Sequence, residues 1–486
     1  MPDPITIGLI LALLIDTVVR GLLVVRIVMR RRSVPVSLAW LVVLLFAPGV
    51  GAALYLLVGE TRLGHRRAAR HARAVEQLKP YELQIWRDKW SQWPSGDGSD
   101  RALSRLATAA TGLPPVAGNR LEMLADAAFV ERLVTDIEAA ERHVHICTYI
   151  WMSTGAGETL AEALIAARAR GIDCRVLVDG VGSRPFLGSA LARRMRAAGV
   201  EITAALPASL LRLPFARLDL RNHRKLAVVD GRIAFVGSHN VTDDGFRVAR
   251  RPSIGPWVDA TIRIEGPAAQ AAQLVFVQDW LLDCAGPITV DHDLLPDVPA
   301  VDAPGTVVQL VPSGPGAVPA AIHDMILATI WSAREELILT TPYFVPDEGT
   351  RAALRAAALR GINVTLVVPE RLDGVIVGLA GNAQLDELLA AGVRVMRHQR
   401  GLLHSKTLTV DRRVAIVGSV NMDMRSFWLN FELTLLVPDD DVASHVAWLQ
   451  QTYMDESKAI DPAAWARRPL WRRFVENVAR LLGPLL

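Results

Sequence analysis

The hydrophobic pattern divides the chain into an apolar beginning and a long alternating remainder. Residues 5–28 and 36–58 are each apolar and long enough to cross a bilayer, and a short basic segment, RRRSVP, lies between them. They predict a two-helix transmembrane hairpin over residues 1–60, with buried helices of a soluble protein as the alternative. A cleaved signal peptide is disfavoured because the start, MPDP, has no basic residue. Asp16 and Arg20 lie four residues apart in the first run, so we expect them to pair on one helical face.

Residues 61–118 are predicted to be a basic, tryptophan-rich juxtamembrane linker. Trp86, Trp90 and Trp93 occur at helical spacing before a turn-rich break. This stripe suits a membrane interface, and packing on the soluble domain is an equal alternative. Because arginines flank the second apolar run on both sides, the positive-inside rule does not orient the chain.

From about residue 120 the chain alternates between strand-like and helix-like segments, and the same order occurs twice. HVHICTYIW, ETLAEALIAARARG and CRVLVDG are followed later by ELILTTPYFVP, EGTRAALRAAALRG and VTLVVPE. The repeat predicts an α/β fold made of two halves, residues 119–300 and 301–486. The proline-rich segment PDVPAVDAPG, residues 296–305, marks the junction.

Composition narrows the class of protein. The chain has 51% hydrophobic and 21% charged residues, which excludes a mainly disordered protein, and its formal net charge is only +3. That small charge gives no sign of a large basic track for nucleic acid. Cys147, Cys174 and Cys284 have no paired spacing, so we interpret them as packing residues rather than disulfide or zinc ligands.

The strongest chemical signal is a doubled motif. Residues 221–240 and 402–421 both contain His-x-Lys-x-x-x-x-Asp, followed after six residues by Gly-Ser-x-Asn. Residues two apart on a strand point to the same side, and the hairpin return can bring the serine and asparagine near them. The motif aspartates fall at the hairpin turns, where we interpret them as structural supports. The members are His223, Lys225, Asp230, Gly237, Ser238 and Asn240 in the first copy, and His404, Lys406, Asp411, Gly418, Ser419 and Asn421 in the second.

This set of side chains suits a phosphodiester. Lysine and asparagine can hold non-bridging phosphate oxygens without a metal, one histidine can attack phosphorus, and the other can protonate the leaving oxygen. A lone histidine on a strand is more often an ordinary core or surface residue, but agreement at six positions in two copies favours catalysis. We therefore predict the two motifs to be the catalytic set and expect no metal and no organic cofactor.

The doubled motif resembles the phospholipase D superfamily from about residue 120 to the C-terminus. SLAWLVVLLFAPGVGAALYLLVGE, ILTTPYFVPDE and GSVNMDMRSFWLNFE look more specifically like its bacterial cardiolipin synthases. One departure is NVTDDGF, residues 240–246, where that family would read closer to NIGDEY. The resemblance implies a two-repeat phospholipase D-like fold of mixed sheets flanked by helices. Its halves would pack face to face, with both histidines in one cleft.

The resemblance also supplies carboxylates that would orient the histidines. PWVDATIRIEGP and WLNFELTLLVP occupy equivalent strands of the two halves, so we assign Asp259 to His223 and Glu432 to His404. The implied reaction joins two phosphatidylglycerol molecules into cardiolipin and glycerol, with phosphohistidine at His223 and His404 as acid and then base. The phosphate would be held by Lys225, Lys406, Asn240 and Asn421, with Ser238 and Ser419 as weaker candidates.

The resemblance further implies a bacterial inner-membrane enzyme with phosphatidylglycerol and other anionic lipids as partners, and no nucleic acid. A homodimer is compatible with the sequence. A hydrolytic phospholipase D or a membrane-tethered nuclease would use the same motifs, and a non-catalytic membrane scaffold is a third alternative. The C-terminal helix either meets anionic head groups or docks on the protein's own core. Its apolar face would comprise Leu470, Trp471, Phe474, Val478, Leu481 and Leu482, beside Arg467, Arg468, Arg472, Arg473 and Arg480.

Overall fold

The computed structural model describes residues 3–30, 34–60, 63–87, 98–207, 217, 219–242, 255–284, 293–301, 305–315 and 320–483. The chain forms two compact units. One comprises Met1–Ala68 with Ala208–Leu220, and the other comprises Ala69–Pro207 with Arg221–Leu486. The predicted tryptophan stripe falls outside this description, because Trp90, Trp93 and the side chain of Trp86 are not described.

The first unit contains one long apolar helix and a broken second run. Among the described residues, α1 (Pro4–Met29) is the one helix long and apolar enough to cross a membrane. The second run divides into α2 (Val34–Phe46), α3 (Val50–Leu54) and the π-helical turn η1 (Tyr55–Gly59). The predicted second continuous helix is therefore not confirmed. Pro48 lacks an amide hydrogen, and Gly49 takes a positive φ of 69° that a helix cannot continue through.

Ionic contacts hold this unit together. Arg20 pairs with Asp16 at 2.7 Å, as predicted, and Asp16 Oδ1 also accepts the Gly49 amide at 2.9 Å. Asp16 thereby satisfies a backbone donor that the break exposes. Arg26 Nε donates to Glu60 Oε1 at 2.6 Å, which ties the end of α1 to the end of the second run.

The predicted linker belongs largely to the second unit. Leu78, on α4 (His65–Arg87), packs into the core that both halves share. Leu103 and Ala107, on α5 (Gly98–Thr111), pack against the helix α11 (Ala321–Ser332) of the second half. These helices bury apolar side chains and so cover the second unit.

The second unit is built on one 16-stranded sheet whose two halves repeat the same strand order. Outward from the junction, the order is β1-β9-β7-β6-β2-β3-β4 in the first half and β10-β19-β17-β16-β11-β13-β14-β20 in the second, and the sixteenth strand, β5 (Arg221–Asn222), pairs with β19 beside this order. The halves join where β1 pairs antiparallel with β10. This order confirms the repeat expected from the sequence. The strands are β1 (Val116–Ala125), β2 (His143–Thr148), β3 (Asp173–Asp179), β4 (Glu201–Ala205), β6 (Leu226–Val229), β7 (Ile233–Gly237), β9 (Ala260–Glu265), β10 (Thr306–Ser313), β11 (Glu336–Thr340), β13 (Asn363–Pro369), β14 (Arg394–His398), β16 (Thr407–Val410), β17 (Val414–Gly418), β19 (Asn430–Val437) and β20 (Ser457–Ala459).

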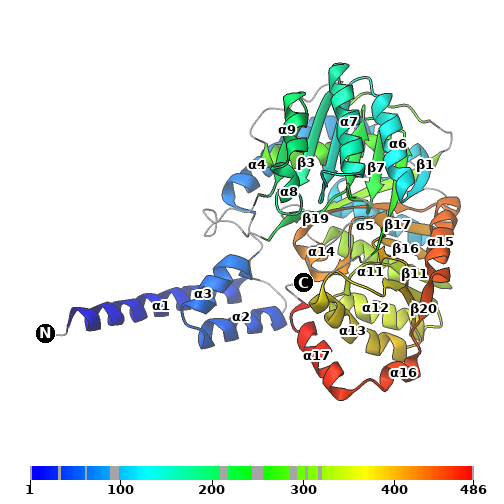
Figure 1. The fold of residues 1–486 in the computed structure, drawn as a ribbon. Helices are drawn as coiled ribbons and strands as arrows, with labels where there is room; N and C mark the ends of the chain where they lie inside the picture. Colours follow the sequence, from blue (N-terminus) through cyan, green and yellow to red (C-terminus); the bar gives the residue numbers. More distant parts are fainter. Residues whose placement is uncertain are drawn as a thin grey trace. The chain divides into compact units, whose positions relative to one another are not determined.

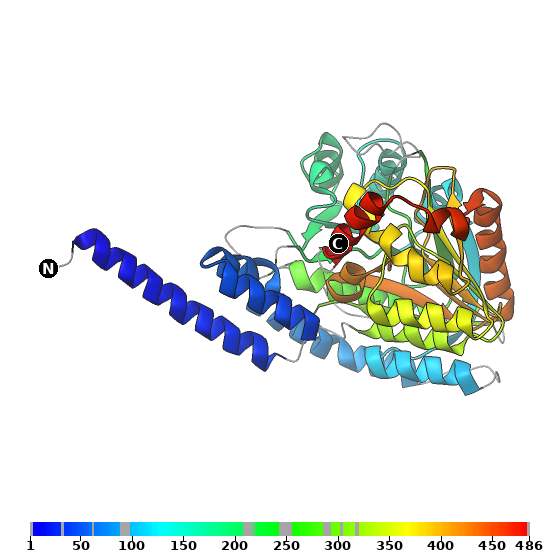
Figure 2. The same ribbon diagram turned by 90° about the horizontal axis from the view of Figure 1, so that it is seen from below.

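Helices cover each half of the sheet in equivalent positions (Figures 1 and 2). In the first half, α6 (Ala127–Glu138), α7 (Ala156–Ala169) and α9 (Ala190–Ala197) pack on strands β2, β3 and β6. In the second half, α11, α12 (Glu348–Leu359) and α13 (Val375–Ala390) pack on β11, β13 and β14. The remaining helices are α8 (Arg184–Leu187), α10 (Ala268–Asp283), α14 (Met424–Trp428), α15 (Asp440–Asp455), α16 (Pro462–Ala466) and α17 (Leu470–Arg480).

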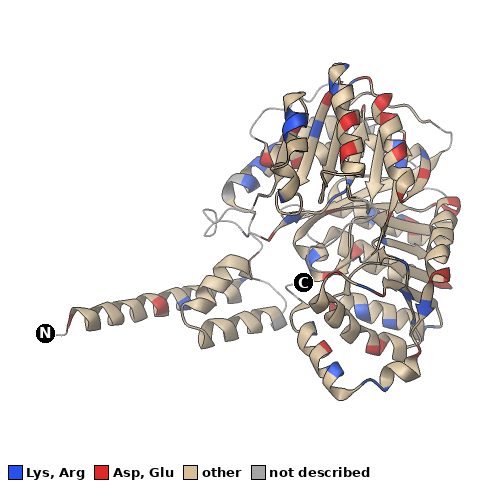
Figure 3. Cartoon of the chain, viewed as in Figure 1, with Lys and Arg blue, Asp and Glu red and all other residues tan. Residues whose placement is uncertain are grey.

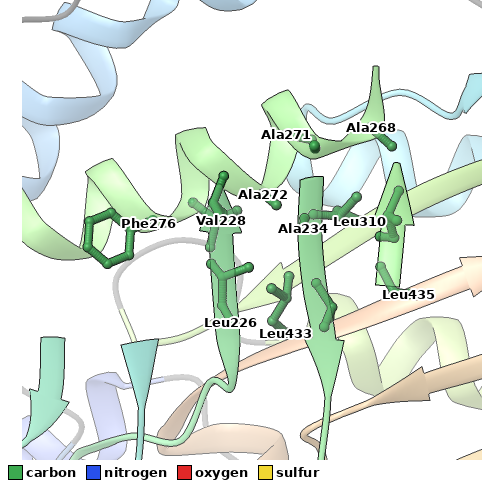
Figure 4. Close-up of a cluster of buried hydrophobic side chains, with 14 of the residues drawn as sticks. Leu226, Val228, Ala234, Ala268, Ala271, Ala272, Phe276, Leu310, Leu433 and Leu435 are labelled. Carbon is green, nitrogen blue, oxygen red and sulfur yellow. The ribbon is translucent and has the colours of Figure 1, made fainter. Parts of the chain in front are cut away.

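The central core is shared by the two halves. Helix α10 is buried on nearly every side. Its Ala271 and Phe276 belong to one cluster with Val228 of β6, and Leu310 and Leu433 of the second half are in the same cluster (Figure 4). Small alanines let this helix approach the strands closely, so the hairpins that carry the doubled motif rest on a rigid base. All three cysteines are free, with Cys147 and Cys174 buried as predicted and Cys284 partly exposed.

Candidate active site

Short parallel strand pairs between the two halves place the motif histidines. Strand β5 (Arg221–Asn222) pairs with the start of β19 in the other half, and the His223 amide donates to Phe431 O at 2.9 Å. Likewise, β15 (Leu402–Leu403) pairs with β8 (Trp257–Val258), and the His404 amide donates to Val258 O at 2.8 Å. Each histidine therefore follows a two-residue strand that is hydrogen-bonded to the opposite half.

This pairing corrects the predicted carboxylate partners. His223 Nδ1 lies 2.9 and 3.0 Å from the two carboxylate oxygens of Glu432, and His404 Nδ1 lies 2.7 Å from Asp259 Oδ1. The prediction of Asp259 for His223 and Glu432 for His404 was wrong. The reason is register: Asn222 is opposite Phe431 and Leu403 is opposite Val258, so the next residue along each strand meets the other half's acid.

The motif serines bind these carboxylates. Ser238 Oγ donates to Asp259 at 2.5 Å, and Ser419 Oγ donates to Glu432 at 2.5 Å. Both serines are fully buried, and neither lines the cavity that the histidines face. The predicted serine contact with phosphate is therefore not supported, because each hydroxyl hydrogen is already used to fix an acid.

The lysines lie beneath the histidines. Lys225 Nζ donates to His223 O at 2.7 Å, and Lys406 Nζ donates to His404 O in the same manner. Each ammonium group thus contacts the backbone of its own motif. Neither lysine is among the residues that line the cavity, so their effect on a ligand there is electrostatic.

Burial determines the charge of the histidines. It lowers the pKa of His223 to about 4 and that of His404 to about 3, against the opposing effect of the adjacent carboxylates and with the help of both lysines. Burial also lowers the pKa of Lys225 to about 8. Burial would raise the pKa of Asp259, but the contact with His404 outweighs it and holds that pKa below its usual value. At neutral pH both imidazoles are therefore neutral, and Asp259 beside His404 is ionised.

The neutral histidines have a defined tautomer. Because Nδ1 of each ring faces a carboxylate, the hydrogen resides on Nδ1 and the lone pair on Nε2. Within the described part of the chain, no hydrogen bond involves Nε2 of His223 or His404. Each Nε2 is thus prepared to act as a nucleophile or a base.

The motif aspartates lie at the hairpin turns, away from the cavity. Asp230 accepts the amides of residues 141, 142 and 143 at 2.8–2.9 Å. Asp411 accepts the amides of residues 334, 335 and 336 in the same arrangement. Both residues have a positive φ of about 51–52°, which aspartate tolerates better than most residues. These contacts support the interpretation of both aspartates as structural supports.

The asparagines line the catalytic cavity. Asn240 Oδ1 accepts the Ile150 amide at 3.1 Å, and its Nδ2 has no hydrogen-bond partner among the described residues. Asn421 Oδ1 is likewise without a partner in the described structure. A buried polar atom without a partner is costly, so Asn240 Nδ2 is suited to donate to a ligand, and Asn421 Oδ1 is suited to accept a hydrogen bond from one.

A cavity of about 400 Å³ contains both histidines and both asparagines. Tyr149 meets the His223 ring edge-on at 5.0 Å, and Trp257 covers the His404 ring at 4.2 Å. The wall also includes residues that the motif analysis did not single out, namely Arg221, Tyr343, Asp373, Asp423 and Arg425. The segment NVTDDGF is described only to residue 242.

Two features of these residues bear on the cavity's chemistry. Tyr343 Oη donates to Asp373 at 2.8 Å, and burial raises the pKa of Asp423 to about 6. The sequence signal that could have identified such wall residues is their position beside the motifs. Arg425, for example, lies in the stretch GSVNMDMRSFWLNFE, directly after the second motif.

Arg224, between the first motif's histidine and lysine, is a further residue that sequence reasoning missed. It donates to Glu432 O and to Ser313 O at 3.0 Å, and it pairs with Asp279 of α10. Its side chain is 5% exposed, so this arginine fixes the first motif to the second half from within the core. Asn222 Nδ2 also donates to Asp279, at 2.9 Å.

Comparisons with known proteins agree with this arrangement. The family described as "Cardiolipin synthase, PLD-like domain" matches residues 133–274 and 326–451, and the family "Phospholipase_D-nuclease N-terminal" matches residues 21–60. "Cardiolipin synthase A" of Salmonella arizonae is 39% identical over 465 residues, covering 95% of each chain. The protein of the same name from Edwardsiella ictaluri is 38% identical over 463 residues, with the same coverage.

A solved structure shares the fold. The phosphatidylserine synthase of Haemophilus influenzae superposes with a TM-score of 0.58 at 15% identity, covering 79% of this chain and all of that one. At this identity the likeness shows the α/β fold alone.

Proposed function

This chain belongs to the cardiolipin synthases of the phospholipase D superfamily, and we propose that it joins two phosphatidylglycerol molecules through a phosphohistidine on His223. The family makes the protein a phospholipid phosphatidyltransferase. The observation that carries the proposed roles is a single cavity with two neutral histidines, each held by the carboxylate of the opposite half. Two such groups let one attack while the other transfers a proton.

In the first step, Nε2 of His223 attacks the phosphorus of the first lipid. The bond from phosphorus to the head-group glycerol oxygen breaks, and His404 donates its proton to that oxygen, so free glycerol leaves. The phosphatidyl group is then bonded to His223. Asn240 and Asn421 hold non-bridging oxygens, while Lys225 and Lys406 offset the negative charge.

In the second step, His404 removes a proton from the head-group hydroxyl of a second phosphatidylglycerol. The resulting alkoxide attacks phosphorus, the bond to His223 breaks, and cardiolipin is formed. His404 again carries the proton that the next first step requires. The sum of both steps is two phosphatidylglycerol molecules in, and one cardiolipin and one glycerol out.

Charge balance explains how His404 can start as an acid although its pKa in the empty cavity is about 3. In the empty cavity, burial and the nearby lysines favour neutral histidines. A phosphodiester brings one negative charge, and an adjacent negative charge raises the pKa of an imidazole. One bound substrate therefore favours one protonated histidine.

The acceptor lipid is itself an anion, and the cavity wall offers charge for it. Arg221 and Arg425 line the cavity beyond the motif residues, and the charges of both act on Tyr149 beside His223. We assign them to the phosphate of the second phosphatidylglycerol, because guanidinium groups bind phosphate oxygens with good geometry. Such a site favours an anionic lipid alcohol over water as acceptor.

The apolar N-terminal helix suits a membrane protein of this family. We assign α1 as a membrane-spanning helix and α2 to η1 as its broken return, which places the enzyme in the bacterial inner membrane with two spans. Both substrates are confined to the bilayer, so anchorage raises their concentration at the cavity. Labelling of single cysteines introduced at residues 3 and 64 with a membrane-impermeant reagent tests this: two spans require both to react from the same side.

The decisive test of the reaction is the product formed from phosphatidylglycerol vesicles by the purified full-length protein. Mass spectrometry should find cardiolipin and an equal amount of glycerol. His223→Ala and His404→Ala should give neither, while His445→Ala, at an exposed position on α15, should match the parent. Phosphatidic acid as the main product would mean that water is the acceptor and would support the hydrolytic alternative.

A further inference from the structure

The C-terminal helix α17 packs on the protein with its polar side. It lies against α13, and the two residues that it buries are Glu476 and Ala479. A helix on a water-soluble surface normally buries its apolar stripe and exposes its charges. Here that order is reversed, which resolves the two alternatives left by the sequence: α17 docks on the core, but its apolar face does not.

Buried charge fixes this orientation. Glu476 is 1% exposed and lies 3.3 Å from both Arg468 and Arg472. Asn382 of α13 also donates to Glu476 at 3.3 Å, and Arg468 pairs with Asp386 of α13 at 2.6 Å. A buried acid that lost these partners would be strongly destabilising, so α17 cannot rotate its apolar face inward at small cost. The charged residues of α13 are acidic, whereas α17 carries charges of both signs (Figure 3).

The outward face of α17 is apolar along its whole length. Leu470 is 79% exposed, Trp471 and Phe474 are each 69% exposed, and Leu481 is 75% exposed. Val478 belongs to the same face. An exposed stripe of this size on one helix marks a surface that meets another apolar phase.

This face lies close to the catalytic cavity. Ala479 packs with Val345 and Ala380, and Gly483, just after the helix, approaches Val345. Val345 and Val377 both line the cavity that contains the histidines. The first turn of α13 adds two more exposed apolar residues, Val375 and Ile376, directly before Val377. Helix α17 and the first turn of α13 therefore both pack beside residues that line the wall of the active site.

We propose that the outward face of α17, together with Val375 and Ile376, inserts into the head-group region of an anionic bilayer and sets the cavity at the level of the phosphates. The positive charge of the C-terminal segment favours an anionic bilayer as the partner. Residues 467–483 contain five arginines and one glutamate, and all of these arginines except Arg468 are exposed. Arginines beside an apolar face attract anionic head groups. A second copy docking by the same face would place like charges opposite each other.

The proposal rests on the proposed function only in naming phosphatidylglycerol as the anionic lipid. Its test is a nitroxide label on Phe474→Cys in the full-length protein, reconstituted in phosphatidylglycerol bilayers. The background carries Cys284→Ala, because the other two native cysteines are buried. Trp448→Cys on α15 is the matched control, since Trp448 is 69% exposed, the same as Phe474.

Collision rates of each label with membrane-soluble oxygen and with a water-soluble nickel chelate report its surroundings. The label at 474 should collide with oxygen and be shielded from nickel, and the label at 448 should show the reverse. Equal nickel access at both positions overturns the proposal. Strong spin–spin coupling between copies at 474 without a gain in oxygen collisions also overturns it, because a second copy would then cover the face.

Turnover supplies a second, independent readout. Trp471→Asp with Phe474→Asp should lower turnover of phosphatidylglycerol in vesicles about tenfold or more, because charges on the inserting face weaken bilayer binding. Turnover of a short-chain, monomeric phosphatidylglycerol should stay within about twofold of the parent. Unchanged turnover in vesicles overturns the proposal. The labelling needs no catalysis, so an inactive parent with a lipid-immersed 474 label would refute the reaction and leave the docking surface in place.

Discussion

Each motif histidine contacts the carboxylate of the opposite half, so substituting one carboxylate should impair one histidine and the reaction step that uses it. If Glu432 holds His223, then Glu432→Gln impairs the nucleophile, and Asp259→Asn impairs the group that moves protons. Each substitution removes a charge-assisted hydrogen bond to Nδ1. Such a bond contributes about 1.5–3 kcal/mol, which corresponds to a rate loss of roughly 10- to 150-fold in the step that uses the histidine.

A phosphatidyl ester of p-nitrophenol distinguishes the two steps, because this leaving group departs without an acid. In stopped-flow measurements, phosphatidylation of His223 appears as a burst of p-nitrophenolate, and turnover follows as a slower steady rate. Glu432→Gln should slow the burst itself. Asp259→Asn should leave the burst rate close to that of the parent and slow only the steady rate, in which His404 must act as a base.

The opposite pattern would refute the reasoning. A slow burst in Asp259→Asn with a normal burst in Glu432→Gln would mean either that each acid serves the histidine of its own half or that the nucleophile is His404. The variants His223→Ala and His404→Ala distinguish these outcomes, because only loss of the nucleophile abolishes the burst. Glu265→Gln, at the far end of β9, serves as the carboxylate control.

Other predictions follow from the same structure. Burst rates in His404→Ala should be level between pH 5 and 7 and fall above pH 8, because burial lowers the pKa of Lys225 to about 8 and a deprotonated lysine no longer offsets the phosphate charge; a rise above pH 8 would contradict this. Asp230→Asn should lower the free energy of unfolding by about 1–3 kcal/mol in urea titrations, with turnover per folded molecule unchanged. Loss of turnover without loss of stability would instead make Asp230 catalytic. Arg425→Gln should raise the ratio of phosphatidic acid to cardiolipin about tenfold in lipid analysis, and an unchanged ratio would remove Arg425 from the acceptor site. Turnover should be the same with and without a strong chelator, since the proposed steps use protein groups alone.

The repeated fold could be predicted because each of its strands and helices has its own hydrophobic pattern in the sequence. Alternating strands and helices recur in the same order in both halves, and the sheet follows that order strand by strand. The broken second apolar run had a signal too: Pro48 and Gly49 lie within it, and that pair marks a turn. Hydrophobic length outweighed this signal in the prediction of a continuous helix.

The doubled motif predicted that both histidines share one cavity, but not which carboxylate each histidine contacts. His223 and Glu432 are 209 residues apart, and two-residue parallel strands bring them together. Strands this short carry no pattern that reveals their partner or their register. For a related reason, the sequence did not show which face of α17 packs on the protein. Periodicity defines its apolar face, but only the buried contacts of Glu476 show which way that face points.

The two half-sites are unequal although their motifs match. Glu432 presents both oxygens to His223 Nδ1 and also accepts hydrogen bonds from Ser419 and Asn430. Asp259 presents one oxygen to His404, the same oxygen accepts a hydrogen bond from Ser238, and Trp257 covers the His404 ring. A ring held at two oxygens keeps one orientation, which suits a nucleophile that must meet phosphorus in line. A ring that alternates between acid and base needs a bond that serves both charge states, and a single short contact to an ionised acid does so. The proposed mechanism needs one neutral and one protonated histidine at the same moment, and we propose that this inequality, rather than the shared motif, makes His223 the nucleophile and His404 the group that transfers protons.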